Sequence, residues 1–137
     1  MSDGGLPHRS ERSELIQLQS LGVVALGGVI GSLARYGLAE AFPHGSGQFP
    51  WATFATNVLG CFLIGVLLAR LTPRSHPLLR PFLGTGILGG FTTFSTFAVD
   101  TEKLLHEHVI VALVYFFGTL AAALLAATLG EWTGPKR

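Results

Sequence analysis

Four long stretches of the chain carry no charged side chain, and this pattern limits what the chain can fold into. They are Leu15–Ala34, Trp51–Ala69, Pro81–Val99 and Val109–Gly130. Each approaches the roughly 20 residues that a helix needs to cross about 30 Å of hydrocarbon. Of the 137 residues, 49% are hydrophobic and only 12% are charged, a balance that is wrong for a soluble domain. We predict an all-α membrane protein with four transmembrane helices.

These spans also define the domain organisation. We place them at about 18–42, 50–71, 78–104 and 108–131, within one membrane domain over residues 15–132. Residues 1–14 are polar and lack apolar periodicity, so we expect them to form a disordered tail. The first apolar stretch is too long for the core of a signal peptide, and three further spans follow it. It is therefore interpreted as a span.

Lysine and arginine are unevenly divided between the two ends of the predicted spans. With four crossings, most of them fall on the side of the N-terminus, namely Arg9, Arg12, Arg70, Arg74, Arg80, Lys136 and Arg137. Only Lys103 and Arg35 fall on the opposite side. Because cytoplasmic ends of membrane helices are enriched in these residues, we expect both termini in the cytoplasm.

The residues inside the spans argue against several classes of function. No Asp, Glu, Lys or His lies near the centre of a span, so there is no carboxylate for proton coupling and no cluster for a transition metal. Ser95 has no intramembrane histidine to activate it, and an enzyme is not expected. The formal net charge of +1 without a basic cluster argues against nucleic acid. The lone Cys61 is interpreted as a small packing residue.

The third apolar stretch contains the unusual segment GGFTTFSTF at 89–97. Gly89–Gly90 can break a helix, and unwound backbone at membrane depth is tolerated only when protein buries it or it lines a watery cavity. Freed carbonyls there can bind a cation. Phe94 and Phe97 share one helix face, where they either pack or turn their positive ring edges toward an anion.

Neutral polar groups also occur in the neighbouring spans. Asn57 follows Thr53 by one turn in the second span, and Tyr115 and Thr119 share a face of the fourth. From the residues alone, Asn57 either forms hydrogen bonds that hold helices together or lines a path for an ion or substrate. Taken with the hydroxyls after Gly90, these donors suit a small, hard anion that must lose its water without being trapped.

Three segments together resemble a known family. GGVIGSLARYGLAE at 27–40, FATNVLGCFLIG at 54–65 and GGFTTFSTF at 89–97 are similar to segments of the Fluc-type (CrcB) fluoride channels. The resemblance implies a fluoride-selective channel of the bacterial inner membrane that lowers cytoplasmic fluoride by passive efflux. It also implies an antiparallel, dual-topology homodimer with two pores and a structural sodium ion.

The resemblance further implies roles for individual residues. Asn57 matches the pore asparagine, Phe94 and Phe97 match the pore phenylalanines, and the carbonyls of Gly89 and Thr92 match the sodium ligands. The groups expected beside the pore or its vestibule are Thr53, Ser95, Tyr115, Thr119 and Arg35.

The chain departs from the family pattern in three ways. Ala123 stands where a polar residue often continues the track beyond Thr119, and Asp100 stands where glutamate is usual. The uneven Lys and Arg distribution favours one orientation, which leaves a heterodimer with a paralogous subunit as an alternative to the homodimer.

Two other functions are alternatives to a fluoride channel. A proton-coupled multidrug exporter needs an embedded carboxylate, whereas Glu40 lies at a span end. In a non-transporting scaffold, Asn57 and the hydroxyls would be only glue between helices. Fluoride efflux without chloride efflux would distinguish the channel from both.

Overall fold

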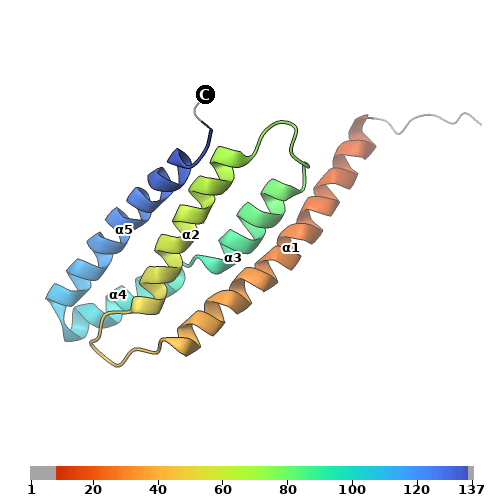
Figure 1. The fold of residues 1–137 in the computed structure, drawn as a ribbon. Coiled ribbons are helices and arrows are strands. Elements are labelled where there is room, and N and C mark those ends of the chain that lie inside the picture. Colours follow the sequence, from red (N-terminus) through yellow and green to blue (C-terminus); the bar gives the residue numbers. More distant parts are fainter. Residues whose placement is uncertain (1–8, 136–137) are drawn as a thin grey trace, which may run out of the picture.

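A computed structural model describes residues 9–135 as a bundle of helices without strands (Figure 1). The elements are α1 (Arg9–Ala41), α2 (Trp51–Arg70), η1 (Arg80–Leu88), α3 (Gly89–Phe91), α4 (Ser95–Glu107) and α5 (Val109–Trp132). Because η1, α3 and α4 follow one another within a single span, four helical spans are long and apolar enough to cross a membrane. This confirms the predicted all-α fold with four spans.

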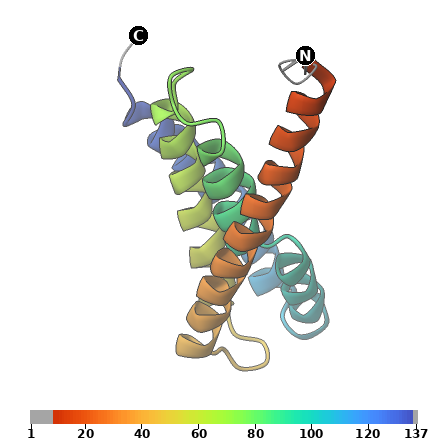
Figure 2. The same cartoon turned by 90° about the vertical axis from the view of Figure 1, so that its right-hand side faces the viewer.

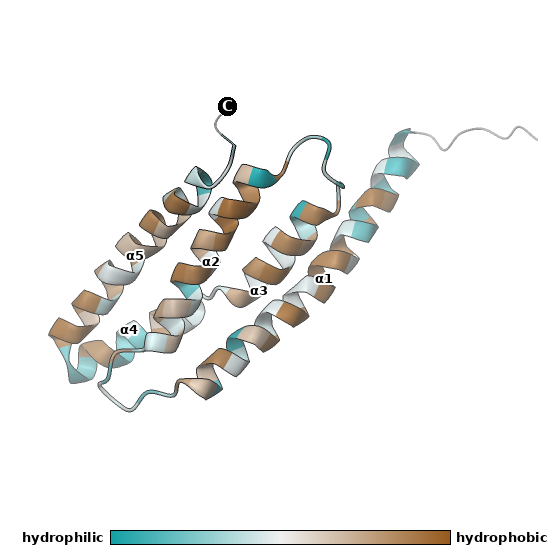
Figure 3. Ribbon diagram, viewed as in Figure 1, coloured by the Kyte–Doolittle hydropathy of each residue, from teal (hydrophilic) through white to brown (hydrophobic). Residues whose placement is uncertain are grey.

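The surface of the bundle is apolar where a soluble protein would be polar. Brown, hydrophobic residues cover the middle of the spans, and teal residues gather in the first turns of α1, after α2 and in α4 (Figure 3). Large apolar side chains such as Leu124 and Ile110 are exposed. The buried apolar cluster is small and consists of Phe97, Leu104, Ala112 and Tyr115. The chain is thus built to face lipid.

Helix α1 begins earlier than the sequence suggested. It starts at Arg9 and continues for 33 residues, or about 50 Å. The prediction of a disordered tail over residues 1–14 is therefore wrong for residues 9–14, while residues 1–8 lie outside the described part of the chain. The segment has Glu11 in its first turn, where negative charge favours a helix. An established helix also extends easily, because each added residue gains one backbone hydrogen bond.

The third span is broken, but one turn later than the double glycine. Gly89 has helical angles (φ −65°, ψ −38°), whereas Thr92 is extended (φ −73°, ψ 155°). Helix α3 ends at Phe91 and α4 begins at Ser95. The expected break in the middle of the third helix is confirmed, and the expectation that Gly89–Gly90 form it is wrong. The preceding segment η1 is a π-helix, which no local sequence pattern predicted.

The glycines serve instead to bring α1 against the third span. A Cβ atom added to Gly90 would lie 2.5 Å from the Gly28 carbonyl oxygen, and one added to Gly27 would lie 2.6 Å from that of Phe82. A Cβ on Gly31 would collide with the Ile87 carbonyl. Small residues allow such close packing between membrane helices, where no hydrophobic force draws the helices together.

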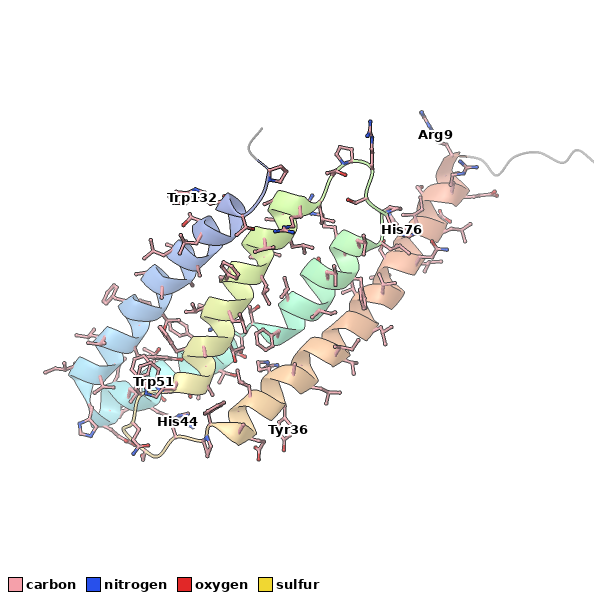
Figure 4. The ribbon with its side chains drawn as sticks, in the orientation of Figure 1. Arg9, Tyr36, His44, Trp51, His76 and Trp132 are labelled. Atoms are coloured by element: carbon pink, nitrogen blue, oxygen red, sulfur yellow. The ribbon has the colours of Figure 1, made fainter. Side chains whose placement is uncertain are left out.

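Helices α2 and α5 form the other tightly packed pair. A Cβ on Gly65 would collide with the Ala127 carbonyl, and one on Gly130 would collide with the Phe62 carbonyl. Gly65 thus lies against Gly130 where the two helices cross. Trp51 at the start of α2 and Trp132 at the end of α5 lie at opposite ends of the bundle, so the two helices run in the same direction (Figure 4). Helix α4 packs against α5 at one end of the bundle (Figures 1 and 2).

The chain returns to the end of the bundle from which it starts. Arg9, His76 and Trp132 lie at one end, and Tyr36, His44 and Trp51 lie at the other (Figure 4). The end that holds Arg9 also holds the connection after α2, which carries Arg74. The predicted division of basic residues is therefore present in the described chain. Lys136 and Arg137, which were counted on the same side, lie outside the described residues.

Candidate functional site

The break in the third span leaves backbone groups that need hydrogen-bond partners, and side chains of two other helices supply them. Asn57 of α2 donates from Nδ2 to the Thr93 carbonyl (2.9 Å), and its Oδ1 accepts from the Thr93 N–H (2.8 Å). Arg35 of α1 donates from Nε to the Gly90 carbonyl (3.1 Å), which also accepts from Ser32 at 3.4 Å. The break is thus held from both sides.

Thr93 also begins the helix that follows the break. Its Oγ1 accepts from the Thr96 N–H at 3.1 Å, the bond that an N-cap residue makes to the first turn. The same hydroxyl donates to Thr96 Oγ1 (3.1 Å) and lies 3.3 Å from Ser95 Oγ. Thr93 is buried and was not among the predicted site residues, although threonine is a preferred residue at the start of a helix.

A cavity of about 220 Å³ lies beside the break, on the side of α2 and α5. We call it the break cavity. Four predicted pore residues line it, namely Asn57, Phe94, Phe97 and Thr119. The other residues that line it are Cys61, Thr92, Thr93, Leu120 and Ala123. Because Asn57 Nδ2 carries two hydrogens and Thr93 takes one, a second N–H remains available beside the cavity.

The two phenylalanines have very different surroundings. Phe97 is only 3% exposed, and its ring centroid lies 5.3 Å from that of Tyr115 and 5.4 Å from that of Phe116. Phe94 lies 6.1 Å from Phe97 but is 78% exposed. Phe97 is therefore fixed within the chain, whereas the Phe94 ring has no cover within residues 9–135.

Two hydroxyls of α5 are buried without a hydrogen bond. Neither Tyr115 Oη nor Thr119 Oγ1 has a partner within residues 9–135. A buried polar group without a partner costs about 1–3 kcal/mol. Thr119 lines the break cavity, so its hydroxyl can bind an ion or molecule that enters the cavity.

Thr53 lies nearer the end of the spans, beside a carboxylate. Its Oγ1 donates to Asp100 Oδ2 at 2.9 Å, and both residues are buried. His44 Nε2 lies 4.0 Å from Asp100 Oδ1. Thr53 is in the first turn of α2, so this carboxylate is close to a membrane boundary and the middle of the spans stays free of charge. Glu40, the other carboxylate considered, is exposed in α1.

The remaining predicted residues lie away from the break cavity. Arg35 lines a second cavity of about 210 Å³ on the other side of the break, which we call the α1 cavity. Its polar lining residues are Ser32, Arg35, Tyr36, Thr53, Thr56, Thr93 and Thr96. Ser95 is exposed and lines neither cavity. The structure thus groups four of the predicted pore residues and separates Arg35 and Ser95 from them.

The carbonyls of Gly89 and Thr92 were predicted to bind sodium. Both residues line a third cavity of about 190 Å³, together with Gly60 and Cys61. Within residues 9–135, neither carbonyl accepts a hydrogen bond. Hard cations prefer oxygen ligands, usually six or more for calcium and magnesium. Two free carbonyls fit part of such a shell, and a sodium ion there would need further oxygen ligands.

The chain is similar in sequence to one known family and to several curated proteins. The family model described as "CrcB-like protein, Camphor Resistance (CrcB)" matches residues 22–131. "Fluoride-specific ion channel FluC 2" of Streptomyces avermitilis is 53% identical over 107 residues, which cover 76% of this chain and 68% of that protein. "Fluoride-specific ion channel FluC 2" of Nocardia farcinica is 48% identical and covers 83% and 82%. "Fluoride-specific ion channel FluC" of Paracoccus denitrificans is 44% identical and covers 81% and 90%.

The matched region begins within α1 and ends within α5. It therefore includes the glycine contacts, the break and every residue that lines the break cavity. This chain belongs to the CrcB-like family.

Proposed function

We propose that this chain forms a fluoride-selective channel that lowers cytoplasmic fluoride by passive efflux across a bacterial membrane. Relatives named as fluoride-specific channels are 42–53% identical over most of the chain. The break cavity is the feature that carries the proposal. It presents a free amide N–H of Asn57 and an unpartnered hydroxyl of Thr119 between aromatic rings, without a fixed charge among its lining residues.

Neutral donors fit the needs of a conducting path. An ion must bind well enough to leave water, yet weakly enough to move on. A hydrogen bond from an amide or hydroxyl contributes only about 0.5–1.5 kcal/mol net. The positive edges of Phe94 and Phe97 add a further weak attraction for an anion. A small anion such as fluoride is a strong hydrogen-bond acceptor and gains most from such donors.

We further propose that two antiparallel chains assemble around this site and enclose two pores. Phe94 is 78% exposed, and its ring needs cover from a second chain to line a path. The free carbonyls of Gly89 and Thr92 provide two oxygens per chain, so a pair of chains would hold a sodium ion with four. When bound, such an ion would join the two chains electrostatically at their contact.

A heterodimer is the alternative assembly. Arg9, Arg12, Arg70, Arg74 and Arg80 belong to the end of the bundle at which the described chain begins and ends. This imbalance favours one orientation in the membrane. Streptomyces avermitilis has relatives named "FluC 2" and "FluC 3", so two chains of opposite orientation from one organism are a reasonable source of the pair.

Ion flux from liposomes that contain only this purified chain tests the proposal. Vesicles loaded with potassium fluoride or potassium chloride are diluted into impermeant salt, and a potassium ionophore balances the charge. We expect rapid fluoride efflux and no chloride efflux. A proton-coupled drug exporter would instead respond to a pH gradient, and a scaffold would release neither anion. Either result would overturn the channel proposal.

Labelling distinguishes the two assemblies. A cysteine added after Arg137, in a variant with Cys61→Ala, is probed with a membrane-impermeant reagent in intact and opened cells. A homodimer predicts labelling from both sides of the membrane. Labelling from one side only, without flux from the purified chain, would favour the heterodimer. Dissociation of purified dimers in sodium-free buffer, measured by gel filtration, tests the ion.

A further inference from the structure

Asp100 places a carboxylate close to both cavities beside the break. It lies one turn after Phe97 on α4, and Phe97 lines the break cavity. Its Oδ2 accepts a hydrogen bond from Thr53 at 2.9 Å, and Thr53 lines the α1 cavity. Asp100 is only 7% exposed, so little water screens its charge. When ionised, this carboxylate repels an anion that approaches either cavity.

The ring of His44 approaches the other oxygen of this carboxylate. His44 Nε2 lies 4.0 Å from Asp100 Oδ1. His44 belongs to the connection between α1 and α2, at the end of the bundle that holds Trp51 (Figure 4). Its side chain is 36% exposed, whereas that of Asp100 is 8% exposed. His44 can therefore exchange a proton with water while its charge acts on a buried group.

Contacts within the connection and with α5 fix the segment that carries His44. The Gly45 N–H donates to Gln48 Oε1 at 2.9 Å, and the Gln48 N–H donates to the Gly45 carbonyl at 3.2 Å. The ring of Phe49 meets that of Tyr115 edge-on, with centroids 5.3 Å apart. The residues that follow His44 are thus held against the bundle, which keeps the imidazole beside the carboxylate.

Other charged or titratable side chains surround the pair. Lys103 and Glu107 of α4 line the small cavity that His44 and Asp100 share. Lysine and glutamate ordinarily keep their charges between pH 6 and 8, so their contribution does not change over that range. The nearby parts of α1 and α5 carry Arg35, Tyr36, Glu40, His108 and Tyr115. Of these five, a histidine alone ordinarily titrates there, which makes His108 a residue to control for.

We propose that His44 is the counter-charge of Asp100 at the entrance of the anion path, and that its protonation speeds the entry of fluoride. This inference rests on the proposed fluoride channel. Histidine ordinarily changes its charge between about pH 5 and 8. Protonated His44 makes the pair neutral and removes the repulsion, whereas neutral His44 leaves the charge of Asp100 unbalanced. Fluoride efflux should therefore rise as the pH falls through this range.

Fluoride efflux from liposomes, with the same pH inside and outside, tests the role of His44. The parent should conduct about two- to tenfold faster at pH 6 than at pH 8, the scale on which one partly screened unit charge acts. His44→Gln should lose this rise and keep the slow rate. His44→Lys carries a fixed positive charge and should conduct at the fast rate at both pH values. Equal pH on the two sides makes the result independent of the orientation of the chain.

Two other histidines at the same end of the bundle provide matched controls. His106 Nε2 lies 2.8 Å from Glu102 Oε1 on α4, but both side chains are exposed. The ring of His108 lies against Gly47. His106→Gln and His108→Gln should both keep the rise in efflux at low pH. Because HF crosses bilayers uncharged, vesicles without protein give the background at each pH.

A double variant tests whether His44 acts through the carboxylate. Asp100→Asn removes the charge but keeps an oxygen that can accept from Thr53. In an Asp100→Asn chain, adding His44→Gln should change efflux by less than about twofold at either pH. Gel filtration checks the assembly of each variant, and if Asp100→Asn does not assemble, the His44 variants decide by themselves.

A rise at low pH that persists in His44→Gln, or its absence from the parent, would overturn the inference and leave the channel intact. An undiminished effect of His44→Gln in the Asp100→Asn chain would show that His44 does not act through Asp100, and would overturn it too. Absence of fluoride efflux from the parent at every pH would overturn the proposed function instead.

Discussion

The broken span forms hydrogen bonds with different residues on its two sides, although on both sides these bonds pair backbone groups that the break leaves free. On the side of α1, the charged Arg35 and the Ser32 hydroxyl bind the Gly90 carbonyl. On the side of α2, the neutral Asn57 binds both backbone groups of Thr93. Each side satisfies backbone that would otherwise be unpaired at membrane depth. Only the α1 side does so with a full charge.

This difference in charge affects how strongly each side would bind an anion. Two unit charges about 4 Å apart attract by about 4 kcal/mol at an effective dielectric constant near 20. A neutral hydrogen bond contributes about 0.5–1.5 kcal/mol. An anion beside Arg35 would thus be retained far longer than one beside Asn57. If the chain conducts fluoride as proposed, we expect the α1 cavity to gather anions and the break cavity to pass them.

The largest effect is expected from a charge placed on the neutral side. Asn57→Asp removes the N–H that binds the Thr93 carbonyl and adds a negative charge beside the cavity. Repulsion of about 4 kcal/mol at 4 Å should lower fluoride efflux at least about 100-fold. Liposome flux measures the effect, and gel filtration checks the assembly. Near-normal flux from an intact variant would make Asn57 only a contact between helices.

A smaller loss is expected when the rings beside the break are replaced. Phe94→Ile and Phe97→Ile keep an apolar side chain but remove the positive ring edge, so each should slow efflux about tenfold or more. Only Phe97→Ile should also lower thermal stability, by about 0.5–1.5 kcal/mol for each ring pair that Phe97 forms with Tyr115 and Phe116. Melting curves followed by gel filtration separate these effects. Parent-like flux from both intact variants would leave the rings as packing.

A milder effect is expected on the charged side. Arg35→Gln removes the charge but keeps a donor that can reach toward the Gly90 carbonyl. If the α1 cavity gathers anions, efflux should fall less than about tenfold, and the loss should be largest at low ionic strength, where charges are least screened. Efflux measured over a series of salt concentrations tests this. A loss as large as that of Asn57→Asp would remove the distinction between the two sides.

The sequence predicted the spans better than it predicted the site. Long uncharged stretches mark membrane helices because hydrocarbon excludes charge, and the four spans follow from that rule. The position of the break does not follow from local pattern. Gly89 and Gly90 are helical, and the chain opens at Thr92–Phe94, where Asn57 binds both backbone groups of Thr93. That contact joins residues 36 positions apart.

Other features depended equally on tertiary contacts. Cys61 was interpreted as a packing residue because its neighbours in the sequence do not reveal that α5 lies beside it. The packing of α5 against α2 depends on Gly65 and Gly130. The buried pair of Thr53 and Asp100 joins two helices in the same way. Local spacing predicted the neighbours of these residues along one helix and not across helices.

The smallest effect is expected at Ser95, which resemblance placed beside the pore. Its side chain is exposed and lines neither cavity, and its hydroxyl lies 3.3 Å from that of Thr93. Thr93 keeps its bond to the Thr96 N–H without it. Ser95→Ala should therefore change fluoride efflux by less than about threefold, the effect of one weak hydrogen bond. Thr119→Val, which removes a hydroxyl inside the break cavity at nearly constant volume, is the matched comparison and should slow efflux more. If Ser95→Ala instead slowed efflux more than Thr119→Val, the path would run past Ser95, and the break cavity would not be the conducting side.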